Sequence, residues 1–123
     1  MTAIVVGGNL LTVTFSGVWT FMNLMVRRGK ERMTVLLNGR MDEDGARLVR
    51  DKLMAEDARP FREVELDISS VTFIGSAGIS KLLLLRTHFA SQKSVLRLIN
   101  PPGHIFELFQ SMRLDKLFGM QRA

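Results

Sequence analysis

The sequence predicts a single α/β domain with a small, mixed and mainly parallel sheet and helices packed on it. From about residue 23 onward, short strand-like apolar runs alternate with stretches of helical spacing, in the order β-β-α-β-α-β-α. The length of 123 residues is enough for one compact core and too short for two. Strands that alternate with helices require crossover connections, so we expect most of the strands to run parallel.

The first two strands of this domain are expected to form a hairpin, which makes the sheet mixed. A short strand over 24–26 is followed by a glycine-containing turn over 27–31 and a second strand over 32–39. A helix is predicted over 41–57, with Asp42 as its N-cap and two acids behind it at the positive end of the helix dipole. Its apolar face consists of residues spaced three or four apart, namely Ala46, Val49 and Leu53.

Two strand–helix pairs complete the predicted domain. A strand over 62–69 carries the apolar positions Val64, Leu66 and Ile68, and a strand over 94–100 follows the second helix, over 76–93. That helix contains four consecutive leucines, 82–85, so we expect it to be buried on more than one side. Pro101-Pro102-Gly103 then starts a third helix. The expected apolar contacts of this last part are Ile105, Leu108, Phe109 and Met112 on the helix, and Leu114, Leu117 and Phe118 in a final turn.

Residues 1–22 form an uncharged extension before the domain, which we place at 23–120, with a tail at 121–123. Three interpretations of the extension stay open. It forms an additional hairpin around Gly7-Gly8-Asn9, or the natural chain begins at Met22 or Met25, or the apolar segment is a membrane or signal anchor. Threonines that alternate with apolar residues favour strands over an integral membrane span. Trp19 would then cover a sheet edge, or would lie in an exposed patch that drives homodimerisation.

The composition argues against several classes of function. The chain has no cysteine, which excludes a disulfide scaffold, a thiolate metal site and a cysteine nucleophile, and which fits a reducing cytoplasm. With only His88 and His104 as imidazoles, we expect no metal, no cofactor and no catalytic residue. The net charge of +5 could attract nucleic acid. The basic residues are nevertheless spread along the chain, apart from one group over 27–32, so no direct nucleic-acid binding is expected.

The stretch Ile74-Gly75-Ser76-Ala77-Gly78 sets a serine between glycines where the second helix begins. From the residues alone, two interpretations stay open. Ser76 caps the helix through its hydroxyl, while Gly75 and Gly78 allow a tight turn and close helix–strand packing. Alternatively, Ser76 is a phosphoacceptor, because the free amides and the dipole of a helix N-terminus favour a phosphate. The spacing does not match a nucleophile elbow, a dinucleotide-binding fingerprint or a phosphate loop.

A longer run around Ser76 contains seven residues at a recognisable spacing: Asp67, Ser69, Val71, Phe73, Ile74, Ser76 and Gly78. This run resembles the hallmark of the STAS family, whose best-known members are bacterial anti-sigma factor antagonists. The family run reads Asp-x-Ser-x-Val-x-Phe-Ile/Met-Asp-Ser-Ser/Thr-Gly-Leu. Gly39-Arg40-Met41-Asp42 is similar to the family's Gly-x-Leu/Ile-Asp before its first helix, and residues 99–118 are similar to its C-terminal helix. The chain departs from the run at Gly75, where the family commonly has aspartate, and at Ala77, where it has a hydroxyl residue.

This resemblance implies a regulatory protein that is not an enzyme. It implies Ser76 as the phosphoacceptor and a cytoplasmic anti-sigma factor with serine kinase activity as the partner, with a phosphatase as an additional one. The expected partner-binding residues are Asp42, Gly75, Ser76, Ala77, Gly78, Ser80 and Lys81. The alternative is a STAS accessory subunit without phosphorylation, attached to an ABC-type lipid transport system, or another ligand-binding module.

Overall fold

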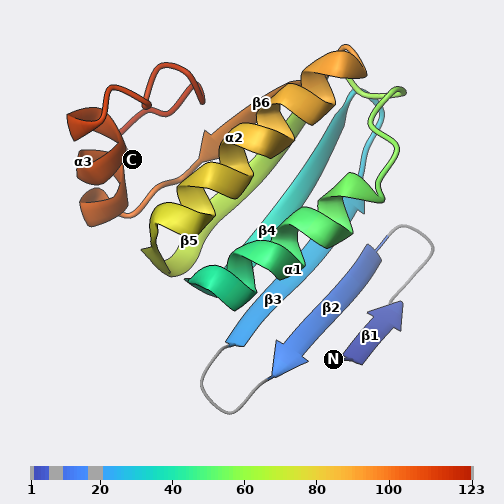
Figure 1. Ribbon diagram of the computed structural model, residues 1–123. Coiled ribbons are helices and arrows are strands. Elements are labelled where there is room, and N and C mark those ends of the chain that lie inside the picture. Colours follow the sequence, from blue (N-terminus) through green and yellow to red (C-terminus); the bar gives the residue numbers. More distant parts are fainter. Residues whose placement is uncertain (1, 6–9, 17–20, 123) are drawn as a thin grey trace.

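A computed structural model shows one six-stranded sheet in which the strands follow their order along the chain (Figure 1). It describes residues 2–5, 10–16 and 21–122, with the backbone alone described up to residue 21. The strands are β1 (Thr2–Val5), β2 (Leu10–Ser16), β3 (Phe21–Arg28), β4 (Arg32–Met41), β5 (Glu63–Ile74) and β6 (Val95–Ile99). The helices are α1 (Glu43–Met54), α2 (Ser76–Ser91) and α3 (Gly103–Ser111).

The strand pairings confirm the predicted fold class. From β3 onward the order is β-β-α-β-α-β-α, with β3 antiparallel to β4 and with β4, β5 and β6 parallel. The uncharged extension does form strands, because β1 and β2 pair antiparallel and β2 continues the sheet beside β3. The expected Gly7-Gly8-Asn9 turn and Trp19 lie outside the described residues.

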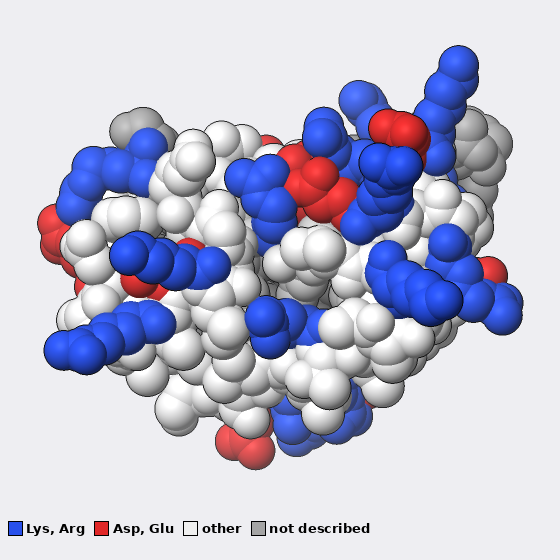
Figure 2. All heavy atoms as spheres, turned by 90° about the horizontal axis from the view of Figure 1, so that it is seen from above, with Lys and Arg blue, Asp and Glu red and all other residues white. Residues whose placement is uncertain are grey.

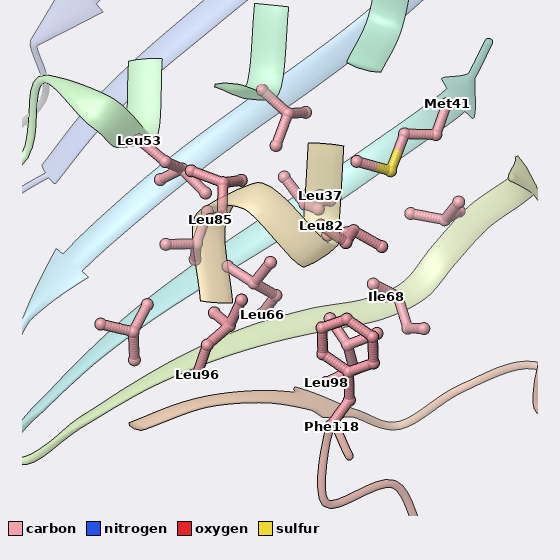
Figure 3. Close-up of a cluster of buried hydrophobic side chains, with 14 of the residues drawn as sticks. Leu37, Met41, Leu53, Leu66, Ile68, Leu82, Leu85, Leu96, Leu98 and Phe118 are labelled. Carbon is pink, nitrogen blue, oxygen red and sulfur yellow. The ribbon is translucent and has the colours of Figure 1, made fainter. Parts of the chain in front are cut away.

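The core lies between the sheet and the two helices that cover one face of it, α1 and α2 (Figure 1). Side chains from all of these layers meet there, and the C-terminal turn adds Phe118 from beside β6 (Figure 3). The apolar positions predicted for the first helix and for the strand over 62–69 are all fully buried, which confirms both faces: Ala46, Val49, Leu53, Val64, Leu66 and Ile68.

Two of the predicted apolar faces are partly wrong. In α2, Leu82 and Leu85 are fully buried, but Leu84 is 46% exposed, because the helix turns about 100° per residue and points this position away from the sheet. The helix is therefore buried on one main face. In α3 the buried residues are Ile105, Phe106 and Phe109, whereas Leu108 and Met112 are exposed, and Leu117 in the final turn is exposed too. This short helix lies to the side of β6 (Figure 1), and three of its nine residues are buried.

The strand β5 is longer than predicted, since it continues beyond Ser69 to Ile74. Its pairing with β4 shifts register between Leu36 and Asn38 and again between Gly39 and Arg40, where Gly39 takes a φ of 127° that favours glycine. After these irregularities Met41 pairs with Ile74. The two parallel strands therefore end at the same level, and this edge holds the candidate site.

Candidate functional site

The carboxyl ends of β4 and β5 bring the starts of α1 and α2 together. The Gly75 N–H donates to the Met41 carbonyl oxygen at 3.2 Å, which joins the two strand–helix turns directly. Asp42 is the N-cap of α1 and Gly75 is the N-cap of α2, so the positive ends of two helix dipoles adjoin. The structure therefore brings together Asp42 and the 75–78 turn, which are more than thirty residues apart in the sequence.

Asp42 caps α1 as predicted. Its side-chain Oδ1 accepts a hydrogen bond from the Gly45 N–H at 2.9 Å, and its carbonyl oxygen accepts from the Ala46 N–H at 2.8 Å. Gly45 is required here by space, because a Cβ at this position would collide with the Arg40 carbonyl oxygen. The cap thus fixes the first turn of α1 tightly against the end of β4.

Ser76 is the first residue of α2 and is exposed to solvent. The prediction that its hydroxyl caps the helix is wrong, because the extended N-cap position is taken by Gly75, which has no side chain to offer. The first amides of the helix have no intrahelical acceptor, and the first turn contains no acidic residue. The hydroxyl therefore stands at an exposed, electropositive helix start.

Gly75 leaves space for an aromatic ring. Its φ of −93° and ψ of −175° suit any residue, but a Cβ would lie only 3.1 and 3.2 Å from Cε2 and Cζ of Phe73. The Phe73 ring is 38% exposed, and the Arg40 guanidinium carbon lies 4.4 Å from its centroid, in a cation–π contact. The sequence did not predict this pair. The feature that would reveal it is the parallel alignment of the two strand ends, in which Arg40 pairs with Phe73.

The remaining predicted contact residues differ in exposure. Gly78 is buried, and a Cβ there would lie 2.8 Å from Ile74 Cγ2 and 2.9 Å from the Met41 carbonyl oxygen. Its role is therefore the close helix–strand packing that was predicted, and it offers no surface to a partner. Ala77 is partly buried against the core and Lys81 is half-buried, while Ser80 is exposed one turn after Ser76. Ser76 and Ser80 are therefore the exposed residues of this predicted contact set.

Asp67 and Ser69, which belong to the matched run, lie beside the loop that follows β6. Asp67 Oδ1 accepts from the Ser69 N–H at 3.0 Å, and Oδ2 accepts from Asn100 Nδ2 at 3.1 Å. Asn100 has a positive φ of 55°, so this bond fixes a left-handed residue just before Pro101. Within β5, Asp67 therefore fixes the residue that follows the end of β6.

The described ranges offer no candidate metal site. Those residues contain no group of three or more His, Asp or Glu side chains arranged to hold a metal ion. His104 is exposed, with Nε2 at 3.1 Å from the Thr72 carbonyl oxygen, and His88 lies half-buried late in α2. Of the helices that the structure describes, none combines the length and the apolar character needed to cross a membrane.

Residues 24–120 match the family model described as "Mlab, STAS domain". The chain belongs to the STAS domain family. The comparison with curated proteins found no match.

Solved structures share the fold of this STAS domain at low sequence identity. The anti-sigma factor antagonist SpoIIAA in its unphosphorylated form is 18% identical, with a TM-score of 0.68 over 81% of this chain and 87% of that one. An anti-sigma factor antagonist from Mycobacterium paratuberculosis is also 18% identical, with a TM-score of 0.69 over 83% and 86%. The murine anion transporter Slc26a9 is similar at 18% identity and a TM-score of 0.62, over 69% of this chain and 14% of the transporter. The STAS fold therefore occurs both alone and within a much larger protein.

Proposed function

We propose that this STAS domain is a regulatory protein of the anti-sigma factor antagonist kind, with Ser76 as its phosphoacceptor. The observation that carries the proposal is the exposed Ser76 side chain at the first residue of α2, where the ends of β4 and β5 meet. The partner is an anti-sigma factor with serine kinase activity, and a phosphatase restores the unmodified form. The similarity to anti-sigma factor antagonists, one of which, the Bacillus SpoIIAA, is also known in a phosphorylated form, supports this assignment.

The helix start is suited to carry a phosphate without damage to the fold. Phosphorylation adds a charge of about −1.5 to −2, which the amides and dipole at a helix N-terminus stabilise. The same charge in a protein–protein interface must lose its water without a matched cation, which weakens the complex by several kcal/mol. An almost complete shift from bound to free partner needs about 5.5 kcal/mol. A single phosphate at this position thus supplies a large part of a binding switch.

The proposed function predicts opposite behaviour of two variants at position 76. Ser76→Ala should keep the partner bound, whereas Ser76→Asp should weaken binding about a hundredfold or more, because a carboxylate carries part of the phosphate's charge. Each variant is used to capture partners from the native host, and mass spectrometry of the wild-type chain from the same host locates any phosphate.

Ser91→Asp provides the matched control. It adds the same charge at an exposed serine of the same helix, about 22 Å from the first turn. It should capture the partner as the wild type does. Equal capture by the wild type, Ser76→Ala and Ser76→Asp, together with an unmodified Ser76, would contradict the switch.

A second function is favoured by the surroundings of Gly75. Where the matched run has an aspartate, this chain has no side chain, and the Phe73 ring with Arg40 above it occupies the adjoining surface. A permanent binding surface built on an exposed aromatic ring and an arginine would serve a STAS accessory subunit of an ABC-type lipid transport system. In that case Phe73→Ala should release the captured partner, which would be an ATPase, while Ser76→Asp and Ser76→Ala bind equally. Both functions are regulatory binding in the cytoplasm and require no cofactor or catalytic residue.

A further inference from the structure

The end of the sheet opposite Ser76 carries an excess of unpaired cations. At this end of the described chain, four exposed basic residues have no ion-pair partner: Arg27, Lys30, Arg62 and Lys93. We call these four residues the basic end. Figure 2 looks down on this end of the molecule, and Lys and Arg side chains stand around much of it.

Backbone contacts place the basic end on three neighbouring segments. The Arg62 N–H donates to the Glu31 carbonyl oxygen at 2.9 Å, and the Val95 N–H donates to the Arg62 carbonyl oxygen at 3.0 Å. A surface hollow of about 550 Å³ lies between the β3–β4 turn and the start of β5, with Lys30, Arg32 and Arg62 in its lining. The four cations therefore lie on neighbouring segments, with Arg27 near the end of β3, Lys30 in the β3–β4 turn, and Arg62 and Lys93 just before β5 and β6.

The acidic residues at this end do not neutralise these four cations. Glu56 pairs with Arg28 at 2.8 Å, Asp57 pairs with Arg59 at 2.9 Å, and Glu63 pairs with Arg97 at 2.8 Å. Glu31 is exposed and is the acid that has no ion pair in this part of the described chain. Four unpaired cations against one unpaired carboxylate make the end attractive to an anionic surface.

An apolar side chain accompanies the cations. Val95 is 62% exposed, more than any other large hydrophobic residue described, and its backbone is bonded to Arg62. The aromatic ring described at this end, Phe61, is 5% exposed and lies beneath the Arg28 guanidinium at 4.8 Å. An exposed valine among cations suits the boundary of a lipid bilayer, whereas nucleic-acid bases would require an exposed ring for stacking.

We propose that the basic end binds a membrane surface that contains anionic lipids. The ten residues of β4 separate this end from the Ser76 edge by about 30 Å, so a membrane-bound molecule would still present Ser76 to a protein. Each basic residue held near an anionic surface strengthens binding about fivefold, and the attraction decreases within a Debye length. The inference is independent of the role of Ser76.

The test is flotation of the full-length protein with vesicles. The protein should bind vesicles of phosphatidylcholine mixed with phosphatidylglycerol, should not bind phosphatidylcholine alone, and should be released by high salt. The triple variant Lys30→Gln, Arg62→Gln and Lys93→Gln should lose binding about a hundredfold, at about fivefold for each cation. The matched control is Arg47→Gln, Arg113→Gln and Lys116→Gln, which removes the same charge from exposed residues elsewhere and should change binding little. Circular dichroism confirms that each variant is folded.

Val95→Ser separates a membrane from a soluble polyanion. It should weaken vesicle binding about fourfold and leave binding to heparin or duplex DNA unchanged. The proposal is overturned if mixed vesicles bind no better than phosphatidylcholine, or if both triple variants lose binding equally. It is also overturned if DNA is bound more tightly than vesicles and Val95→Ser affects neither, which would assign the basic end to nucleic acid.

Discussion

At the scale of single residues, the Arg59 side chain holds the pKa of Asp57 below its ordinary value. Its Nε donates to Asp57 Oδ1 at 2.9 Å, its Nη2 donates to Oδ2 at 3.0 Å, and its backbone N–H donates to Oδ1 at 3.0 Å. The side-chain hydrogen bond, followed by the backbone one, lowers the pKa of Asp57 from 3.8 to about 2. A depressed carboxyl pKa stabilises the folded state above the ordinary pKa, and this contribution is lost as the pH falls from 3.8 towards 2.

Replacement of Arg59 tests this assignment. In Arg59→Gln the guanidinium is gone, so the pKa of Asp57 should rise most of the way towards 3.8, while the backbone hydrogen bond keeps it slightly lower. An NMR pH titration of the Asp57 carboxyl carbon measures the change. Because the pair is exposed, the melting temperature at neutral pH should change little. An unchanged titration of Asp57 would show that Arg59 is not the cause.

The residues of the candidate site could be predicted from the sequence where they depend on close neighbours. The Asp42 cap needs only the three residues that follow it, and the sequence predicted it correctly. The Phe73–Arg40 contact depends on the pairing of two strands that lie 33 residues apart, and no local pattern encodes that pairing. The interpretation of Ser76 as the helix cap was wrong by one position, because Gly75 is extended and the helix begins one residue after it.

At the scale of elements, α2 and α3 end in the same backbone motif. The last turn of α3 closes with Arg113 N–H donating to the Gln110 carbonyl oxygen at 3.0 Å and Leu114 N–H donating to the Phe109 carbonyl oxygen at 2.8 Å. Arg113 has a φ of 59°, and Lys93 occupies the same position after α2 with a φ of 64°. This is a Schellman motif, in which glycine is the usual left-handed residue. The helices therefore end in a conformation that their own sequence disfavours.

Glycine at this position should stabilise the protein. Arg113→Gly removes the side chain that strains a left-handed backbone, so the free energy of unfolding should rise by about 1 kcal/mol. Chemical denaturation of the two proteins measures the difference. Glu107→Gly, at an exposed position in the middle of the same helix, is the control and should lower stability by about the same amount. A loss of stability in Arg113→Gly would mean that the arginine makes a contact worth more than the strain.

The elements themselves could be predicted better than their ends. Alternation and helical spacing gave the order and type of every element from residue 23 onward, because each buries one apolar face. The helix predicted to reach residue 57 ends at Met54, and the helix predicted to reach 93 ends at Ser91. Neither stop is marked by glycine. The buried face of α3 was predicted only in part. Ile105, Phe106 and Phe109 alone are enough to pack so short a helix against the core.

At the scale of the whole molecule, the described core begins inside β3. Met22 is fully buried and Leu24 is 1% exposed, while Met25, on the other face of the strand, is partly exposed. Met22 and Met25 are the two alternative starting points of the chain. A chain that begins at Met22 therefore keeps two buried side chains that a chain beginning at Met25 lacks.

A chain that begins at Met22 should fold, and a chain that begins at Met25 should not. The shorter chain lacks two buried side chains, and each such loss costs about 2–5 kcal/mol, against a total stability of about 5–15 kcal/mol for a domain of this kind. Thermal unfolding followed by circular dichroism should show a cooperative transition for the first chain and a weak or absent one for the second. Equal melting temperatures would mean that the start of β3 contributes little to the core.

The sheet keeps the order of the chain from β1 to β6, so no strand is placed between two that were made earlier. During synthesis each new strand can dock on the outer edge of what the ribosome has already released. The segment from β6 through α3 to Phe118 emerges after the other strands and closes the side of the core next to β5. A ribosome stalled before this segment is made would hold a nascent sheet with β5 as an exposed edge, and this is the intermediate that a chaperone would need to shield.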